Sequence, residues 1–256
     1  INTGDTIQGS AEALHTRGQA LVDVLNLFKI DVYAPGNWEF VYGTDRFLEL
    51  FVGDPANGIA PQAPWNTISA NVHFTAEKPE YAAKAGQRVL PPYAIKQVNG
   101  VMVGVIGFTT DRGPQVVGSG VTRGFKFKNS APGSAGIAGS DASEVEVELQ
   151  ARIAELRPQV DLLIVASELG LANNILLAER NAGIDLVLSS DMHEETTKPV
   201  VVKTGTIISE AGQDGTQLAE MKVNVVDGKL SSWTYTLHTI TAAVPEAATL
   251  ASSIQP

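Results

Sequence analysis

The chain has 256 residues, of which 44% are hydrophobic and 18% charged, and its 18 Lys+Arg against 28 Asp+Glu give a net charge of −10. This apolar content excludes extensive disorder, and no apolar run reaches the roughly 18 residues of a membrane span. The acidic balance argues against a nucleic-acid partner, because no basic surface is available to neutralise phosphates. The absence of cysteine excludes disulfides, thiolate metal sites and a cysteine nucleophile.

Strands and helices alternate along most of the chain, which indicates an α/β fold. Asn99-Gly100 and Asp227-Gly228 predict tight hairpin turns. The apolar pattern predicts, in chain order, the tail of a strand at 1–3, a helix at 21–28, a strand at 31–34, a short helix at 47–51, a strand at 67–72, a hairpin at 93–98 and 101–108, a long loop at 109–141 with a short strand at 124–127, a helix at 145–156, a buried strand at 160–166, a helix at 171–181 and strands at 185–188, 200–202 and 206–209.

Both ends of the chain are predicted to be connecting segments. The sequence opens on the strand tail at 1–3, where no targeting peptide is visible, and a helix is predicted to start at Pro245. We therefore expect one domain over 1–243 and, over 244–256, the start of a linker helix that leads to a C-terminal domain or a partner chain.

Polar residues gather directly after four predicted strands, which end near residues 3, 34, 166 and 188. Ligands of an α/β sheet bind beyond the carboxyl ends of its strands, so these polar groups are expected to converge. Carboxylates that meet at one place repel one another unless a cation or proton lies between them, and a site for two divalent metals is the simplest explanation. The candidate ligands are Asp5, Asn37, Glu168, Asp191 and His193.

Each of these residues alone has an ordinary structural explanation. Aspartate and asparagine are common in turns and at helix N-caps, which would explain Asp5 and Asn37. Glu168 and Asp191 are equally able to cap a helix. A single histidine is more often a surface or core residue than a ligand, and we expect this of the remaining histidines, His15, His73 and His238.

Six short motifs occur in an order that is found in a known family. Residues 4–10, Gly-Asp-Thr-Ile-Gln-Gly-Ser, are similar to the motif Gly-Asp-x-x-x-Gly-[Ser/Thr], and residues 36–43, Gly-Asn-Trp-Glu-Phe-Val-Tyr-Gly, to Gly-Asn-His-Glu-Phe-Asp-x-Gly. The others are Ser-Ala-Asn at 69–71, Ser-Glu-Leu-Gly at 167–170, Ser-Asp-Met-His at 190–193 and Ala-Gly-Gln-Asp-Gly at 211–215. Together they resemble the catalytic domain of the 5′-nucleotidase-type calcineurin-like metallophosphoesterases, from Ile1 to about Pro245.

Within that family the chain resembles the sulfur-oxidation thiosulfohydrolases, which share Trp-Glu-Phe in the second motif and a Thr-Arg-Gly like Thr16-Arg17-Gly18. The resemblance implies a four-layer αββα sandwich whose first strand would precede Ile1, with two metal ions between the sheets. It implies that Asp5 bridges the ions, that Asn37, Glu168 and Asp191 hold one of them, and that His193 reaches the other. It also implies export, so a periplasmic or secreted location is expected.

The chain departs from the family pattern at several positions. The family's Asp-x-His motif would lie before Ile1. Trp38 and Val41 replace a histidine and an aspartate that act on the transferring phosphoryl group in the nucleotidases, which implies a changed mechanism. Glu168 and Asp191 replace two imidazoles, and carboxylate oxygen favours Mg, Mn or Ca over Zn.

Three functions remain open at this point. The first is a metal-dependent, 5′-nucleotidase-like hydrolase in which metal-activated water attacks the phosphate or sulfur ester of a small anionic substrate such as a nucleotide. Its candidate catalytic residues are Asn37, Trp38 and Arg17, and its ions are Mn, Mg, Zn or Ca. The second is a catalytically degenerate relative that acts as a binding or structural module, and the third is a secreted module whose carboxylates bind calcium.

Overall fold

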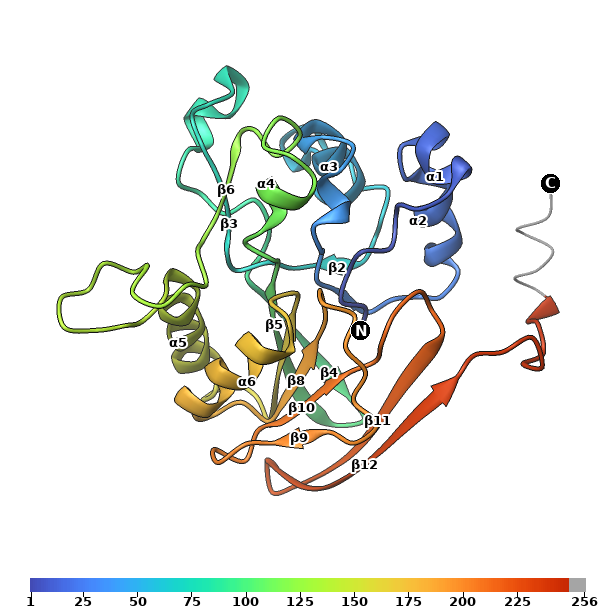
Figure 1. The fold of residues 1–256 in the computed structure, drawn as a ribbon, viewed down its shortest axis with the longest axis vertical. Helices are drawn as coiled ribbons and strands as arrows, with labels where there is room; N and C mark the ends of the chain where they lie inside the picture. The colour runs from blue at the N-terminus through green and yellow to red at the C-terminus, as the bar shows by residue number, and fades with distance from the viewer. Residues whose placement is uncertain (249–256) are drawn as a thin grey trace.

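The computed structural model describes residues 1–248, and Figure 1 shows the arrangement of their elements. The α-helices are α1 (Ala11–Thr16), α2 (Gln19–Asn26), α3 (Thr44–Phe51), α4 (Gly113–Val116), α5 (Glu144–Leu156) and α6 (Leu171–Arg180), and short 3-10 helices are η1 (Trp38–Phe40), η2 (Pro55–Asn57) and η3 (Pro79–Lys84). The strands are β1 (Val32–Tyr33), β2 (Asn66–Thr67), β3 (Val72–Phe74), β4 (Tyr93–Val98), β5 (Val101–Phe108), β6 (Phe125–Phe127), β7 (Leu162–Ser167), β8 (Leu186–Ser189), β9 (Val200–Val201), β10 (Ile207–Glu210), β11 (Gln217–Val226) and β12 (Lys229–Thr239).

A six-stranded sheet with the order β4-β5-β7-β8-β10-β9 forms the centre of the molecule. Strands β5, β7, β8 and β10 run parallel, whereas β4 and β9 are antiparallel edge strands. Every residue of β7 is buried, as its continuous apolar run predicts for a strand covered on both faces. The carboxyl ends of the four parallel strands therefore lie at one edge of this sheet.

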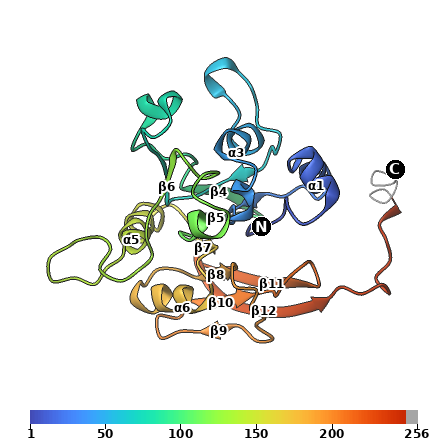
Figure 2. The same ribbon diagram turned by 45° about the horizontal axis from the view of Figure 1, so that its top comes forward.

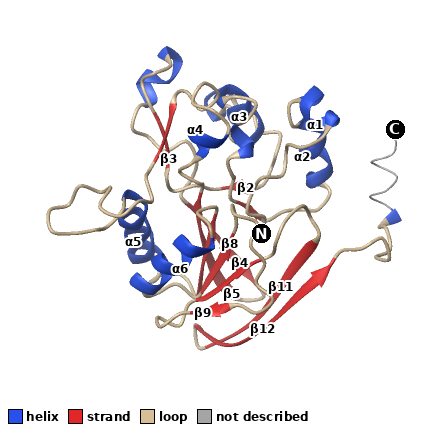
Figure 3. Cartoon of the chain, in the orientation of Figure 1, coloured by secondary structure: helices blue, strands red, loops and turns tan. Residues whose placement is uncertain are grey.

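Alternate residues of the central strands face two different apolar layers. On one face, Ile106, Leu163 and Val187 pack against α5 and α6. On the other face, Val105, Ile164 and Leu186 pack against β1 and the β11–β12 hairpin. Figures 2 and 3 show this hairpin beside the β8–β10 part of the sheet.

The outer face of β1 carries the second helical layer. Tyr33 stacks with Phe51 of α3 at a ring-centroid distance of 5.5 Å, and Val22 of α2 lies in the same cluster. The order of layers is therefore α5 and α6, the six-stranded sheet, the β1–β2 and β11–β12 strands, and α2 and α3. This is the four-layer αββα sandwich that the sequence predicts.

The prediction of one continuous strand at 67–72 is wrong, because this segment passes between two sheets. Thr67 pairs with β1, whereas Val72 pairs with Phe127 of β6. Between them, the amide N–H of Ala70 donates to the carbonyl of Gly107 at 2.7 Å. The predicted loop at 109–141 also contains the short helix α4.

Both predicted hairpin turns are confirmed by left-handed backbone angles, with φ of 50° at Asn99 and 51° at Asp227. The first residues are tied to the fold as well, because Asn2 pairs in parallel with Tyr33. The linker helix predicted from Pro245 onward falls largely on residues 249–256, outside the described part of the chain.

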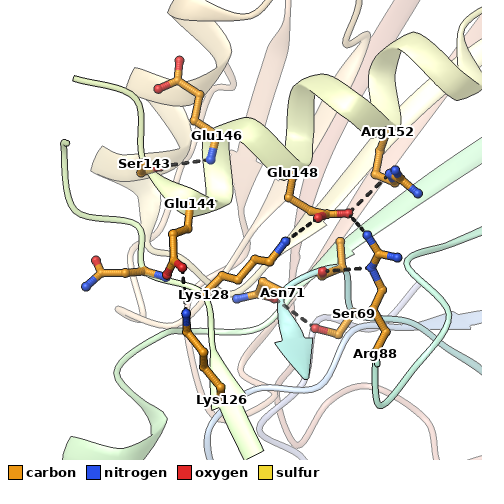
Figure 4. Close-up of polar contacts among 12 residues, drawn as sticks. Ser69, Asn71, Arg88, Lys126, Lys128, Ser143, Glu144, Glu146, Glu148 and Arg152 are labelled. Atoms are coloured by element: carbon orange, nitrogen blue, oxygen red, sulfur yellow. Dashed lines mark hydrogen bonds and ion pairs between the residues drawn. The ribbon is translucent and has the colours of Figure 1, made fainter. Parts of the chain in front are cut away.

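A buried carboxylate joins α5 to the strands beneath it (Figure 4). The side chain of Glu148, only 5% exposed, accepts from Lys128 Nζ at 2.6 Å and forms a further ion pair with Arg88. Arg88 also donates to the carbonyl of Ala70. These pairs are part of the scaffold, since they lie on α5 and the segments under it rather than at the carboxyl ends of β7 and β8.

Candidate metal centre

The loop after Asn2 brings Asp5 against the loop that follows β1. A Cβ atom on Gly4 would lie 2.2 Å from the backbone nitrogen of Gly36, so the two loops touch at a position that only glycine fits. Asp5 itself has a φ of 57°. Its Oδ1 accepts from the backbone N–H of Trp38 at 2.9 Å, which fixes the direction of the carboxylate.

The buried carboxylate of Glu39 holds these two loops together. Its carboxylate, 1% exposed, accepts from the backbone N–H groups of Asp5 at 2.8 Å, Thr6 at 2.8 Å and Gly36 at 2.7 Å. Three N–H donors satisfy the buried charge without any cation. In the sequence, Glu39 stands within a recognisable motif, but no pattern there indicates this role.

The carboxylates of Asp5 and Glu168 converge over Gly36. A Cβ atom at Gly36 would lie 2.2 Å from Asp5 Oδ1 and 2.7 Å from Glu168 Oε2, so both oxygens surround one point. Glu168 is 1% exposed, and its Oε2 has no hydrogen-bond partner within residues 1–248. The Nδ2 atom of Asn37, a residue 3% exposed, is likewise buried without a partner in that part of the chain.

Asp191 lies beside this group but is already engaged. Its side chain is 3% exposed and forms an ion pair with Arg112, which follows β5. The same guanidinium nitrogen lies 2.8 Å from Met192 Sδ. Ser190 Oγ donates to the carbonyl of Thr3 at 3.0 Å and so ties this loop to the one that carries Asp5.

Sequence reasoning missed Arg112, although a signal for it was available. Arg112 follows the end of β5, which is the neighbour of β7 in the sheet, so the rule that selected Glu168 and Asp191 applies to it as well. The residues after β5 were instead interpreted only as a long loop.

The remaining candidates are His193, Arg17 and Trp38, whose side-chain and backbone contacts among the described residues are with other partners or through the main chain. His193 is exposed, and its Nδ1 lies 3.2 Å from Gln213 Oε1. The exposed Arg17 donates to the carbonyl of Tyr42 at 3.0 Å, and the half-buried Trp38 contributes its backbone N–H to Asp5. Among residues 1–248, no three side chains of His, Cys, Asp or Glu come together as a metal-binding group.

Burial and mutual repulsion set the charge state of this site. Burial, and next the charge of Glu39, raises the pKa of Asp5 to about 7. Burial and the charge of Asp5 raise the pKa of Glu168 well above its usual value. Burial also raises the pKa of Asp191, although the charge of Arg112 opposes that rise. A cation between such carboxylates would favour their charged forms.

The residues present fit a divalent metal ion. Glu168 offers a buried oxygen that no donor among residues 1–248 uses, Asp5 points toward the same place, and Asn37 follows Gly36 directly in the chain. Carboxylate and amide oxygens are the ligands that hard cations such as Mg²⁺, Mn²⁺ and Ca²⁺ prefer.

Several characterised proteins are similar to this chain in sequence, although no family model matches it. The trifunctional nucleotide phosphoesterase YfkN of Bacillus subtilis is 27% identical over 241 residues, which cover 87% of this chain and 16% of that protein. Human 5′-nucleotidase is 23% identical, over 73% of this chain and 28% of its own length, and a snake venom 5′-nucleotidase of Naja atra is 26% identical over 73% of this chain. This chain is a homologue of the 5′-nucleotidase-type calcineurin-like metallophosphoesterases.

Solved structures show that it also has the metallophosphoesterase fold. SoxB of Thermus thermophilus, described as a sulfate thiohydrolase, superposes with a TM-score of 0.77 at 23% identity, over 98% of this chain and 40% of that one. A 5′-nucleotidase precursor of the same organism gives a TM-score of 0.75 at 21% identity, over 98% of this chain and 47% of that one. The expected fold is thereby confirmed.

This metallophosphoesterase-like chain spans 16–31% of the length of its curated relatives. Proteins of the family are phosphoester hydrolases that use divalent metal ions in general. None of the helices in residues 1–248 combines the length and the apolar character that crossing a bilayer requires.

Proposed function

We propose that this chain is the catalytic part of a divalent-metal-dependent hydrolase that acts on phosphate esters of small anionic molecules such as nucleotides. The observation that carries the proposal is the convergence of Asp5 and Glu168 over Gly36, with Glu168 Oε2 buried and unpartnered within residues 1–248. An unpaired buried carboxylate is costly, and a scaffold retains it where a ligand completes the site.

The residues of the chain have distinct roles in this proposal. Asp5, Asn37 and Glu168 would hold the metal, and Asp191 and His193 stand at its border. A bound divalent ion polarises the phosphoryl oxygen and lowers the pKa of water. Glu39 keeps Asp5 in place through the backbone, and Trp38 and Arg17 are the proposed substrate contacts, the former through its indole N–H.

Sulfur esters are a second candidate substrate class, because the likeness to SoxB extends over 98% of this chain. Manganese is the ion that we propose first, since it accepts carboxylate, amide and water oxygen. We also propose one domain over 1–243 with a substrate-selecting domain or partner chain beyond it. A periplasmic or secreted location is proposed as well, in line with the venom relative.

A catalytically silent binding module is the alternative function. The ion pair between Arg112 and Asp191 favours it, because one expected metal ligand already has a cationic partner within the protein.

Asp5→Asn separates the two functions. The variant removes the charge that faces Glu168, and we expect hydrolysis of p-nitrophenyl phosphate or a 5′-nucleotide in Mn²⁺ to fall by about a hundredfold or more. The measurement is steady-state turnover of the purified chain at pH 7. Asp23→Asn, an exposed carboxylate on α2, is the matched control and should retain full activity. Turnover that survives in Asp5→Asn contradicts the proposed role of Asp5 in a metal-dependent hydrolase, and a wild type without turnover despite bound metal supports the binding module.

A further inference from the structure

We propose that a buried chain of hydrogen bonds, which links the carboxyl ends of β7, β8 and β10, positions the loops that carry the candidate metal ligands. The members of this chain are Ser167, Asn174, Ser189 and Glu210. The inference rests on the proposed metal-dependent function but goes beyond it, because it assigns positioning residues that lie outside the set of ligands.

Three members of the chain form one row across the central sheet. Ser189 of β8 pairs in register with Ser167 of β7 on one side and with Glu210 of β10 on the other. Two positions before Ser189, Val187 lies in the apolar layer with α5 and α6. Since alternate residues of a strand share a face, the polar row lies on this same face, at its carboxyl edge.

Every donor in the chain points toward Glu210. Ser167 Oγ donates to Asn174 Oδ1 at 2.7 Å, and Asn174 Nδ2 donates to Ser189 Oγ at 2.9 Å. Ser189 Oγ then donates to Glu210 Oε2 at 2.6 Å. None of these residues is more than 4% exposed. Hydrogen bonds in such a series polarise one another, so the chain holds more firmly than its separate bonds would.

Both ends of the chain adjoin the loops of the candidate site. Ser167 directly precedes Glu168, and because neighbouring strand residues face opposite ways, a fixed Ser167 side chain directs Glu168 to the other face of the sheet. At the far end, Glu210 Oε1 accepts at 2.9 Å from the backbone N–H of Glu194, the residue after His193. The chain thus ties the loop after β7 to the loop after β8.

Packing alone does not explain a polar row at this place. Valine or isoleucine would bury apolar surface there, whereas buried hydrogen bonds gain little over contacts with water. Burial raises the pKa of Glu210 to about 7, against the effect of the Ser189 hydrogen bond, and the charge of Glu194 adds to the rise. What a satisfied polar network does provide is a single arrangement of the backbone, and here that backbone carries the candidate ligands.

The charge-neutral variant Ser189→Ala tests the inference, because it removes the middle hydroxyl of the chain. The full chain is stripped with EDTA, and its affinity for Mn²⁺ is measured by calorimetry at pH 8. We expect the dissociation constant to rise by about tenfold in the variant, as it does when other groups that orient metal ligands are removed. Ser189→Thr keeps a hydroxyl and should restore most of the affinity.

A control and a second interruption accompany this variant. Ser209→Ala removes a buried serine of β10 that is outside the chain, and its affinity for Mn²⁺ should equal that of the wild type. Asn174→Ala interrupts the chain on a helix, where alanine is favoured, and should weaken binding as much as Ser189→Ala does. The double variant Asn174→Ala/Ser189→Ala should bind no more weakly than either single variant, because both changes break one chain.

The outcomes separate this inference from the proposed function. A wild type that binds Mn²⁺ no more tightly than Ser189→Ala and Asn174→Ala would overturn the inference and leave the hydrolase proposal standing. Equal losses in Ser189→Ala and Ser209→Ala, or losses that add in the double variant, would overturn it as well. A wild type that binds no metal would overturn both. Circular dichroism melting identifies any loss of fold, and if Ser189→Ala does not fold, Asn174→Ala decides.

Discussion

Three of the buried carboxylates, Glu39, Glu148 and Glu168, have three different environments, and the difference suggests their roles. Glu39 accepts three backbone N–H groups, Glu148 is surrounded by basic side chains, and Glu168 keeps an oxygen without a partner in the described residues. The first two are complete within the described residues, whereas the third is the metal ligand that we propose. Sequence position predicted that Glu168 lies at a strand end.

The partners of these residues could not be predicted from the sequence. Arg112 lies 79 positions from Asp191 in the chain, and only the strand order brings them together. For Glu39, the three N–H donors come from two separate loops, so no local pattern in the sequence predicts these hydrogen bonds.

Glu148 gives the stability of the fold a defined pH dependence. Burial alone would raise its pKa, but the hydrogen bond from Lys128 and the charges of Lys128 and Arg88 hold the pKa below its usual value. A depressed pKa contributes stability above the ordinary value of about 4.3, and this stability is lost as the pH falls through the folded-state pKa. Glu148→Gln should therefore lower the free energy of unfolding by about 3 kcal/mol at pH 7 and lose less of it between pH 5 and pH 3.

Urea unfolding of the wild type and Glu148→Gln over that pH range is the measurement. Glu49→Gln is the control, because the Glu49 side chain is 59% exposed and its pair with Arg46 contributes little. Parallel pH curves for wild type and Glu148→Gln would contradict the assignment.

At the scale of single elements, hydrophobic spacing was sufficient to predict a helix or strand that packs against a continuous apolar surface. The predicted strand at 160–166 and helix at 145–156 correspond to β7 and α5 within about two residues. The prediction of one strand at 67–72 was wrong because the apolar residues of this segment belong to two sheets in turn. The polar side chains of this segment instead form hydrogen bonds with one another and with the residue that follows β5. Asn71 Nδ2 donates to the carbonyl of Thr109 at 2.7 Å. Such a crossing depends on the other strands, which are remote in sequence.

The crossing of this segment over β5 requires glycine at position 107. A Cβ atom there would lie 2.4 Å from the carbonyl oxygen of Ile68, which is backbone and unable to yield. Gly107→Ala should lower the free energy of unfolding by about 2–3 kcal/mol. Gly120→Ala is the control, because nothing lies within 4 Å of its Cβ position, and it should be neutral or slightly stabilising. Chemical denaturation of both variants measures the difference, and equal stabilities would show that the strands separate easily.

At the scale of the whole molecule, the four layers bring separate loops to one edge of the central sheet. Motif order predicted this architecture through its resemblance to a family, and the superposition with SoxB confirms the fold. The metal centre was predicted from strand ends and stays a prediction, and the structure brings the carboxylates of Asp5 and Glu168 together over Gly36. The same arguments placed His193 there as well, but its exposed ring lies beside Gln213. Loop conformation beyond a strand end has no periodic signal, so this part was beyond sequence reasoning.

The central claim is that Asp5 and Glu168 form a cation site, and the thermal stability of Glu168→Gln with and without manganese tests it most directly. In EDTA the variant should melt no lower than the wild type, because it replaces a carboxyl group whose charged form burial and Asp5 disfavour. At a hundredfold excess of Mn²⁺ over its dissociation constant, the wild type should gain about 5–10 °C, whereas the variant gains little. Glu80→Gln, an exposed carboxylate, should follow the wild type in both conditions. A wild type whose melting temperature does not respond to manganese, or a variant that responds equally, would contradict the claim.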